Sequence, residues 1–183
     1  SRKPSRFRRS RLPTPRRIPN SDLAWSLQET SVRYAEQGSG ASEKPDQVAL
    51  EFDALGKPSL YTTTLSCGQG HETTFTAVFA ETLGIAPENV TLRQGVSGKG
   101  ISGNNAGGSR SLVALGSVCK LAAQRLIMQA QPLAAETLEL DTSQLEYRAG
   151  ANRSRDGNKT IGLLDLARSL AGTTPHPLNL MAE

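Results

Sequence analysis

The alternation of apolar and polar positions predicts a β-hairpin ahead of residue 66. Val48, Leu50 and Phe52 alternate with polar neighbours across 47–53, which is the period of a half-buried strand. Residues 54–57 have the composition of a short connection, and 59–65 form a partner strand rich in β-branched residues. A weaker alternation over 31–37 predicts a further strand. The hairpin leads directly into the glycine-containing segment 67–71.

Two helices follow from apolar spacings of three and four. The first starts near residue 72, with Thr73 or Thr74 as a cap near its start and Gly84 at the position after its end. The second is the clearest helix of the chain and is predicted to run from about 110 to about Gln131. Its apolar positions are Leu112, Leu115, Cys119, Ala122 and Leu126.

The ends of this second helix follow from its flanking residues. Ser109 or Ser111 is a plausible N-cap, and Pro132 is expected to end the helix. Residues 133–140 form either a second short helix or a continuation of the first.

The rest of the chain gives shorter signals. Residues 89–94 read as a strand, 145–147 and 159–161 as a strand pair, 161–170 as a short amphipathic helix, and 173–183 as loop. The predicted class is therefore α+β, with β-hairpins followed by helices packed on a mixed sheet.

Charge divides the chain into two parts. The first 19 residues hold eight of the 21 basic residues and none of the 17 acidic ones, so the remainder carries a net charge of −4. We expect 1–30 to be a basic, proline-rich, extended segment, either a solvated tail or a stretch that docks on an acidic partner surface, and 31–183 to be the folded domain. Nucleic acid is not expected as a partner, since eight aromatic residues give no stacking surface. No signal peptide or membrane span is evident, so the expected compartment is the cytoplasm.

The potential metal ligands and thiols are few. Cys67 and Cys119 have neither metal-site nor redox-motif spacing. Cys119 lies on an apolar helix face and is expected in the core. Cys67 is either a small buried residue, which is the favoured reading, or a reactive thiol. His71 lacks a second ligand at zinc spacing, and His176 is expected at the surface.

Two glycine-rich segments each precede a predicted helix, at 68–70 and at 107–108. A helix N-terminus offers unpaired N–H groups and partial positive charge, and glycine allows a ligand to approach the backbone closely. Arg110 adds a positive charge suited to phosphate. These residues alone favour neither an anionic-cofactor site nor simple turns decisively, because neither segment is a known nucleotide-binding signature.

The combination of three blocks is more specific. Residues 68–75 (GQGHETTF), 83–90 (LGIAPENV) and 107–111 (GGSRS) match, in order and spacing, the molybdopterin-binding large subunit of the xanthine dehydrogenase, aldehyde oxidase and carbon monoxide dehydrogenase family. The chain therefore resembles a part of such a subunit, and it covers a minor portion of one.

The resemblance implies a site around a molybdenum-molybdopterin cofactor, possibly in dinucleotide form. Gln69 would lie beside the metal and hydrogen-bond its oxo ligand, so it is the expected catalytic residue. The expected cofactor-binding residues are Gly68, Gln69, Gly70, His71, Gly107, Gly108, Ser109, Arg110 and Ser111, and none is expected to ligate the metal. The 2Fe-2S and FAD groups of the family are expected on partner chains or domains. The family's reaction is oxidative hydroxylation of aldehydes or N-heterocycles with oxygen from water.

The chain also departs from the family pattern. It contains no Gly-Glu dipeptide, which carries the family's general base, and Glu72 is better suited to serve a helix N-terminus. Alone, the chain is expected to be inactive. An alternative is a non-catalytic remnant of the same fold that works as an interaction module through its basic N-terminal tail.

Overall fold

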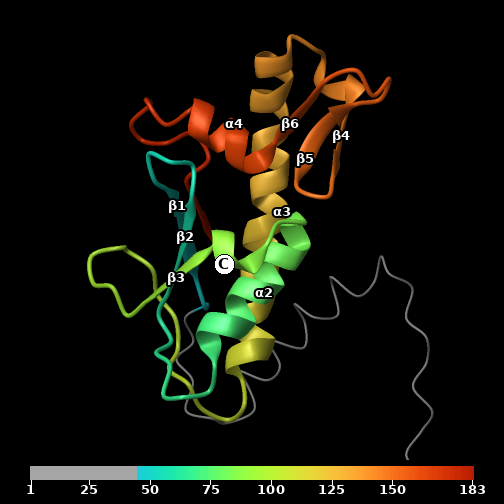
Figure 1. Ribbon diagram of the computed structural model, residues 1–183. Coiled ribbons are helices and arrows are strands. Elements are labelled where there is room, and N and C mark those ends of the chain that lie inside the picture. Colours follow the sequence, from blue (N-terminus) through green and yellow to red (C-terminus); the bar gives the residue numbers. More distant parts are fainter. Residues whose placement is uncertain (1–44) are drawn as a thin grey trace, which may run out of the picture.

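A computed structural model describes residues 45–183 and shows two sheets joined by a long helix (Figure 1). The larger sheet has the strand order β3-β2-β1-β7 and comprises β1 (Val48–Phe52), β2 (Pro58–Thr62), β3 (Thr91–Gln94) and β7 (Leu180–Ala182). β1 pairs antiparallel with both β2 and β7, whereas β2 and β3 are parallel. The expected mixed sheet is therefore confirmed.

The smaller sheet is antiparallel and lies at the other end of the molecule. It has the order β4-β5-β6, with β4 at Leu145–Arg148, β5 at Ala151–Ser154 and β6 at Thr160–Gly162. A 3₁₀ turn at Thr142–Gln144 precedes it, and helix α4 (Leu163–Ser169) follows it. The sequence identified the outer strands as partners, but each of them pairs instead with β5, which the polar segment 152–158 concealed.

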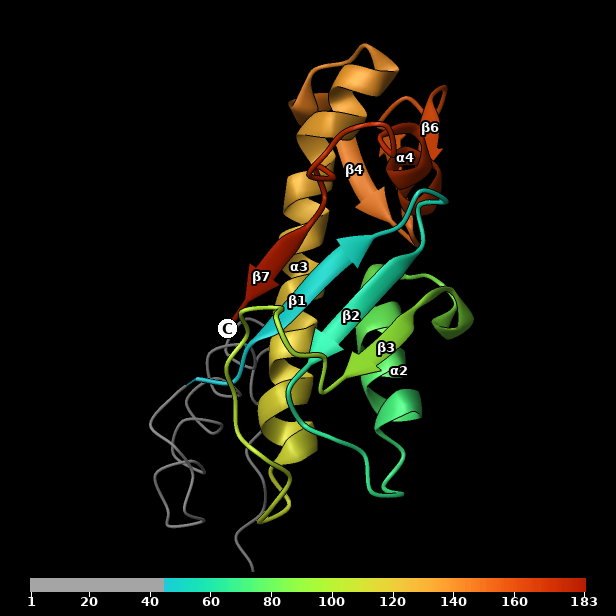
Figure 2. The same cartoon turned by 90° about the vertical axis from the view of Figure 1, so that its left-hand side faces the viewer.

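Helices α2 (His71–Leu83) and α3 (Ser111–Leu138) pack against each other and cover one face of the larger sheet (Figures 1 and 2). A 3₁₀ turn at Pro87–Asn89 connects α2 to β3. The core lies between these helices and the sheet, and its large, fully buried side chains include Leu50, Leu60, Phe75, Phe79, Leu115 and Leu126.

Helix α3 runs further than its sequence predicts. Pro132 lies inside the helix, which ends at Leu138 and is capped by the left-handed Glu139. Proline removes one helical hydrogen bond, but the alanines at 130, 134 and 135 on either side of it are buried. Packing on both flanking turns thus keeps the helical path, and 133–138 continue α3.

The C-terminal segment is ordered rather than loop-like. Leu180–Ala182 pair with β1, and Leu178 is completely buried. His176, expected at the surface, is also buried: its ring stacks on Phe52 at 5.2 Å and its Nε2 donates to the Ala167 carbonyl at 2.9 Å. The segment looks polar in sequence, yet it supplies the edge strand that completes the sheet.

Candidate functional site

The two glycine-containing segments lie at the same end of the molecule. α2 and α3 run side by side in the same direction, so their N-termini and the segments 65–70 and 103–110 that precede them meet at the lower end of Figures 1 and 2. We call the junctions at Gly70–His71 and at Arg110–Ser111 the first and second corners. The sequence predicted two loop-to-helix corners that close on one group, and the fold places both at one end.

At the first corner, the backbone turns sharply into α2. Gly68 and Gly70 have φ angles of 97° and 73°, which side-chain-bearing residues rarely adopt. Gly70 is the N-cap of α2 and no side chain caps the helix; Thr73 and Thr74 do not do so, and the Thr74 hydroxyl instead donates to the Gly70 carbonyl at 2.5 Å. The free N–H groups of the first helical turn therefore remain available to a ligand.

Gln69 projects from an exposed loop at this corner. Its Oε1 accepts from the Cys67 N–H, and its Nε2 lies 3.4 Å from the Leu65 carbonyl. In this structure the carboxamide folds back over its own loop. Because the second contact is long, few interactions have to break before the carboxamide can face a ligand.

At the second corner, Gly108 and Ser109 are both left-handed, with φ angles of 56° and 58°. Arg110 is the N-cap of α3, and no side chain caps this helix either. Ser109 and Ser111 were the expected caps, but neither side chain accepts a hydrogen bond from the N-terminal N–H groups of α3. The residues from 105 to 109 are all exposed, so their backbone is accessible from outside.

Gly107 is informative because nothing in the described chain requires a glycine there. Its φ is not in the left-handed range, and a Cβ added to it would meet no atom within 4 Å. Gly103 contrasts with it, since a Cβ there would meet the Thr63 hydroxyl at 2.3 Å and Asp46 at 3.0 Å. Gly103 is thus needed because neighbouring residues of the chain pack closely against it, whereas Gly107 leaves open space beside the backbone at the N-terminal end of α3.

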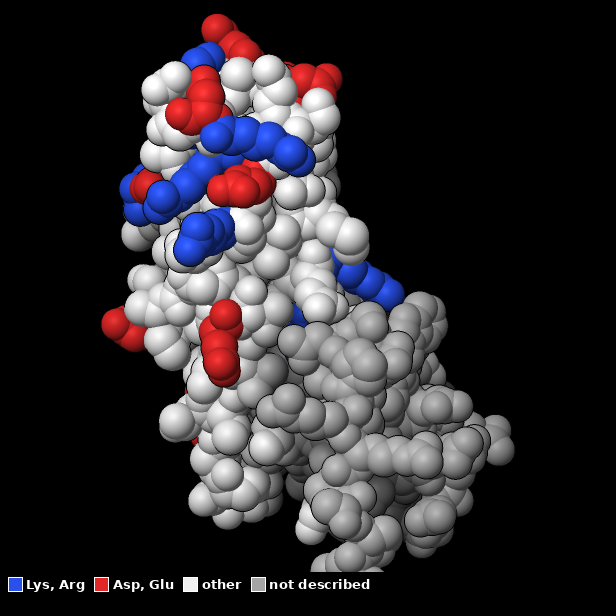
Figure 3. Space-filling model, turned by 90° about the vertical axis from the view of Figure 1, so that its right-hand side faces the viewer, with Lys and Arg blue, Asp and Glu red and all other residues white. Residues whose placement is uncertain are grey.

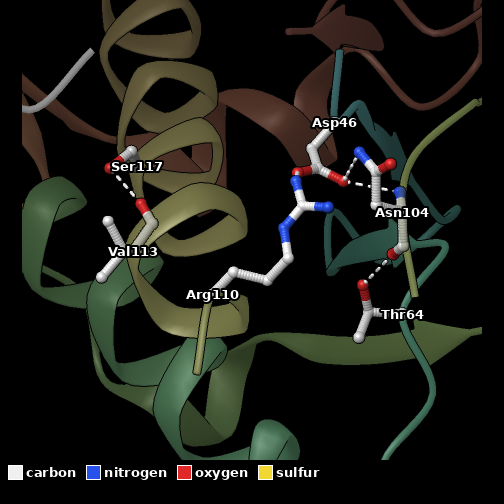
Figure 4. A network of polar contacts seen from close by, with 6 residues as sticks. All are labelled: Asp46, Thr64, Asn104, Arg110, Val113 and Ser117. Atoms are coloured by element: carbon white, nitrogen blue, oxygen red, sulfur yellow. Dashed lines mark hydrogen bonds and ion pairs between the residues drawn. The ribbon is translucent and has the colours of Figure 1, made fainter. Parts of the chain in front are cut away.

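The Arg110 side chain is buried and paired. Its Nη2 donates to Asp46 Oδ2 at 2.7 Å, and both side chains are less than a tenth exposed (Figure 4). The sequence suggested a positive charge directed at an anion, but the charge is balanced within the chain. Arg110 Nη1 is buried and has no partner.

His71 is the first residue of α2 and lies in the interior. Its ring stacks on Phe75 at 4.6 Å, and its Nδ1 lies 3.1 Å from Gln94 Nε2. Gln94 Nε2 also donates to the Thr64 carbonyl at 2.5 Å, which fixes the amide orientation. Nδ1 therefore accepts, the proton of the neutral ring sits on Nε2, and that buried N–H has no partner.

Sequence reasoning missed four residues that hold the corners. Asp46, Thr64, Gln94 and Asn104 are at least partly buried and hydrogen-bonded to one another or to the corner residues. Asp46 and Asn104 stand in loops whose polarity suggested solvent.

The two cysteines and the other possible metal ligands of the described residues form no metal site beside these corners. Cys119 is buried as expected and Cys67 is exposed, so the favoured reading of Cys67 as a buried residue is wrong. Burial raises the pKa of the Cys119 thiol to about 12. Within 45–183, no group of three or more His, Cys, Asp or Glu side chains is placed to hold a metal.

The charged surface of the described part is mixed. Figure 3 shows Lys and Arg interspersed with Asp and Glu toward the end that carries β4 and β5. The strand predicted at 31–37 and the basic segment 1–30 lie outside the described residues. By length and composition α3 could cross a membrane; many of its apolar residues, Leu115 and Leu126 among them, pack in the core, whereas Leu112 and Met128 are exposed.

The described chain is an α+β domain with two uncapped helix N-termini at one end. The chain belongs to the molybdopterin cofactor-binding domain family, whose model matches residues 24–179. The resemblance seen in the sequence is thereby confirmed.

Characterised relatives agree with this assignment. The chain is 33% identical over 118 residues to the 6-hydroxypseudooxynicotine dehydrogenase complex subunit gamma of Paenarthrobacter nicotinovorans, covering 64% of this chain and 15% of that protein. It is 30% identical over 123 residues to the carbon monoxide dehydrogenase large chain of Hydrogenophaga pseudoflava, covering 67% and 15%. The chain thus spans about 15% of the length of these relatives.

A solved structure gives the same fold. A Cu,Mo-CO dehydrogenase in its carbon monoxide reduced state superposes with a TM-score of 0.66 at 27% identity, over 75% of this chain and 18% of that one. A quinoline 2-oxidoreductase from Pseudomonas putida 86 shares the fold at a TM-score of 0.54 and 22% identity.

The residues at the corners fit a pterin cofactor with phosphate groups. Both helix N-termini lack side-chain caps, Gly107 leaves room beside its backbone, and His71 carries a buried N–H without a partner. These are donor groups and space, which suit an anionic, hydrogen-bonding group. They offer no thiolate or imidazole cluster that would hold a bare metal ion.

Proposed function

We propose that this chain forms one wall of the molybdenum cofactor site in the large subunit of a molybdenum hydroxylase. The observation that carries the proposal is the pair of uncapped helix N-termini at one end of the fold, each preceded by a glycine-containing loop. Family membership and the relatives' names support the same role.

The chain's residues would hold the cofactor mainly through the backbone. N–H groups of 68–71 and of 107–111 would donate to the pterin and to its phosphate or dinucleotide extension. Gly107 would let the group approach closely, because no Cβ occupies the space beside it. The Gln69 carboxamide would leave its weak contact with Leu65 and donate to an oxygen ligand of the metal.

The bound group would supply an acceptor for two electrons, so that a substrate C–H and water give C–OH, two protons and two electrons. The proposed substrates are aldehydes or N-heterocycles, and the electrons would pass to 2Fe-2S and FAD groups on partner chains. We assign no general base to this chain, because Glu72 is exposed in the first turn of α2 and serves that helix end. The assembled enzyme is expected in the cytoplasm, and the chain alone is expected to be inactive.

The test compares two glycines in the complex assembled with its partner subunits. Gly107→Ala and Gly172→Ala both place a Cβ in open space at an ordinary φ, so both variants should fold normally. Only Gly107→Ala should reduce the molybdenum and pterin content of the purified complex, by at least tenfold. Equal cofactor content in the two variants would refute the proposal.

A second variant separates holding the cofactor from serving the reaction. Gln69→Ala removes an exposed side chain whose hydrogen bonds stay within its own loop, so molybdenum content should stay near that of the parent complex. The turnover rate should fall sharply. Unchanged turnover in Gln69→Ala would exclude the role given to this residue.

A further inference from the structure

A continuous chain of polar contacts joins the two corners inside the fold. It begins at the first residue of α2 and passes through β3 and through the segments that precede α2, α3 and β1, and it ends at the N-cap of α3. Figure 4 shows the part of it from Thr64 to Arg110. Its members, in order, are His71, Gln94, Thr64, Asn104, Asp46 and Arg110.

The first half of this network fixes the ring of His71. The Gln94 amide donates one hydrogen to the Thr64 carbonyl and the other to His71 Nδ1. A rotation of the Gln94 amide would place its oxygen against the Thr64 carbonyl, which is repulsive. The tautomer of His71 thus depends on where the Thr64 backbone lies.

The second half fixes Arg110. Asp46 accepts from the Asn104 backbone N–H at 2.7 Å, from Asn104 Nδ2 at 3.3 Å and from Arg110 Nη2 at 2.7 Å. A buried carboxylate with several donors and one cationic partner is firmly held. Because Asp46 bonds both Asn104 and Arg110, the position of Arg110 and of the start of α3 depends on the position of the loop at 104.

Thr64 is the junction between the halves. It is 3% exposed; its carbonyl accepts from Gln94, and its hydroxyl donates to the Asn104 carbonyl at 2.8 Å. One residue therefore bonds toward both corners with two different groups. Removal of the hydroxyl alone would interrupt the chain without altering the Gln94 contact.

We propose that this network is a positioning unit that couples the two corners, with Thr64 as its junction and Arg110 as a positioning residue in place of a phosphate ligand. The proposal deepens the proposed function and rests on it for its purpose, since coupled corners would present their N–H groups to one cofactor at a fixed spacing. The coupling itself is a property of the chain and is measurable without any cofactor.

The test perturbs the second corner and observes the first. The full chain contains two histidines, so ¹⁵N-labelled imidazole spectra give two readily assigned sets of signals. Asp46→Asn should shift the His71 nitrogens and populate its other tautomer, while His176 stays unchanged. In a Thr64→Val background, the same Asp46→Asn change should shift the His71 ¹⁵N signals at least threefold less. In a Thr64→Ser background, which keeps the hydroxyl, Asp46→Asn should again give the full shift.

Matched controls exclude a general loosening of the fold. Glu51→Gln breaks the more exposed Lys99–Glu51 pair, and Thr82→Val removes a helical hydroxyl contact of 2.8 Å, so neither should alter His71. If Asp46→Asn does not fold, Gln94→Met with the amides of 104–110 as readout tests the coupling in the opposite direction.

A response of His71 that is equal with and without the Thr64 hydroxyl, or no response at all in folded variants, would overturn the inference. Its failure is distinct from failure of the proposed function. The proposed function is decided by the cofactor content of Gly107→Ala, whereas the coupling is decided by spectra of the cofactor-free chain.

Discussion

Loss of the Asp46 carboxylate should destabilise the fold far more than loss of a surface carboxylate. Asp46→Ala leaves the guanidinium of Arg110 buried without a counter-charge, and Arg110 is only 6% exposed. Removal of one partner from a buried pair costs about 3–5 kcal/mol. Glu51→Ala breaks the pair with Lys99, whose side chains are 26% and 39% exposed and screened by solvent, so its cost should be much smaller.

Urea unfolding followed by far-UV circular dichroism measures both costs on the full chain. A double variant, Asp46→Ala with Arg110→Met, should recover part of the loss, because the buried charge leaves together with its partner. An Asp46→Ala variant as stable as Glu51→Ala, or no recovery in the double variant, would refute the reasoning that Arg110 is held inside the chain.

Three further predictions test other parts of the fold. Thiol reagents at neutral pH should label Cys67 quickly and Cys119 only on unfolding, because Cys119 is buried and its pKa is raised to about 12; rapid labelling of both would contradict the packing of α3. Burial raises the pKa of Tyr147, so the contribution of this residue to stability should be constant below about pH 10 and fall above it as the unfolded phenol ionises. Tyr147→Phe should reduce this loss of stability at high pH, and should lower the free energy of unfolding at neutral pH by about 1 kcal/mol because the hydrogen bond to the Leu83 carbonyl is lost. If the dependence of stability on pH is the same in Tyr147→Phe, the prediction is wrong. Gly84→Ala should cost at least about 1–2 kcal/mol, since φ is +69° and its Cβ would lie 2.8 Å from the backbone of the β4–β5 turn; an unchanged Tm would contradict this contact.

The sequence predicted the elements whose signal is local and periodic. The β1–β2 hairpin, α2 and most of α3 follow from alternation or from spacings of three and four. The elements that depend on distant partners were missed or left open. β7 was expected as loop and is a strand because β1 lies beside it. The continuation of α3 through Pro132 was one of two alternatives, and the helix continues because the alanines around the proline are buried.

The two corners of the candidate site were predictable from the sequence, and their internal contacts were not. Glycines before apolar helices indicated both corners, and the fold brings them to one end. The partner of Arg110 is 64 residues away in the chain, and Gln94 meets His71 across 23 residues. Neither contact leaves a local pattern, because a buried polar residue in a loop has the same sequence signature as a solvated one.

Anomalous diffraction at the molybdenum edge, from crystals of the assembled complex, tests the proposed cofactor site most directly. We expect one strong molybdenum peak beside the Gln69 side chain, with pterin density along the backbone of 68–71 and 107–111. A fully occupied molybdenum peak with no contact from Gln69, or with the cofactor away from these two helix ends, would contradict it.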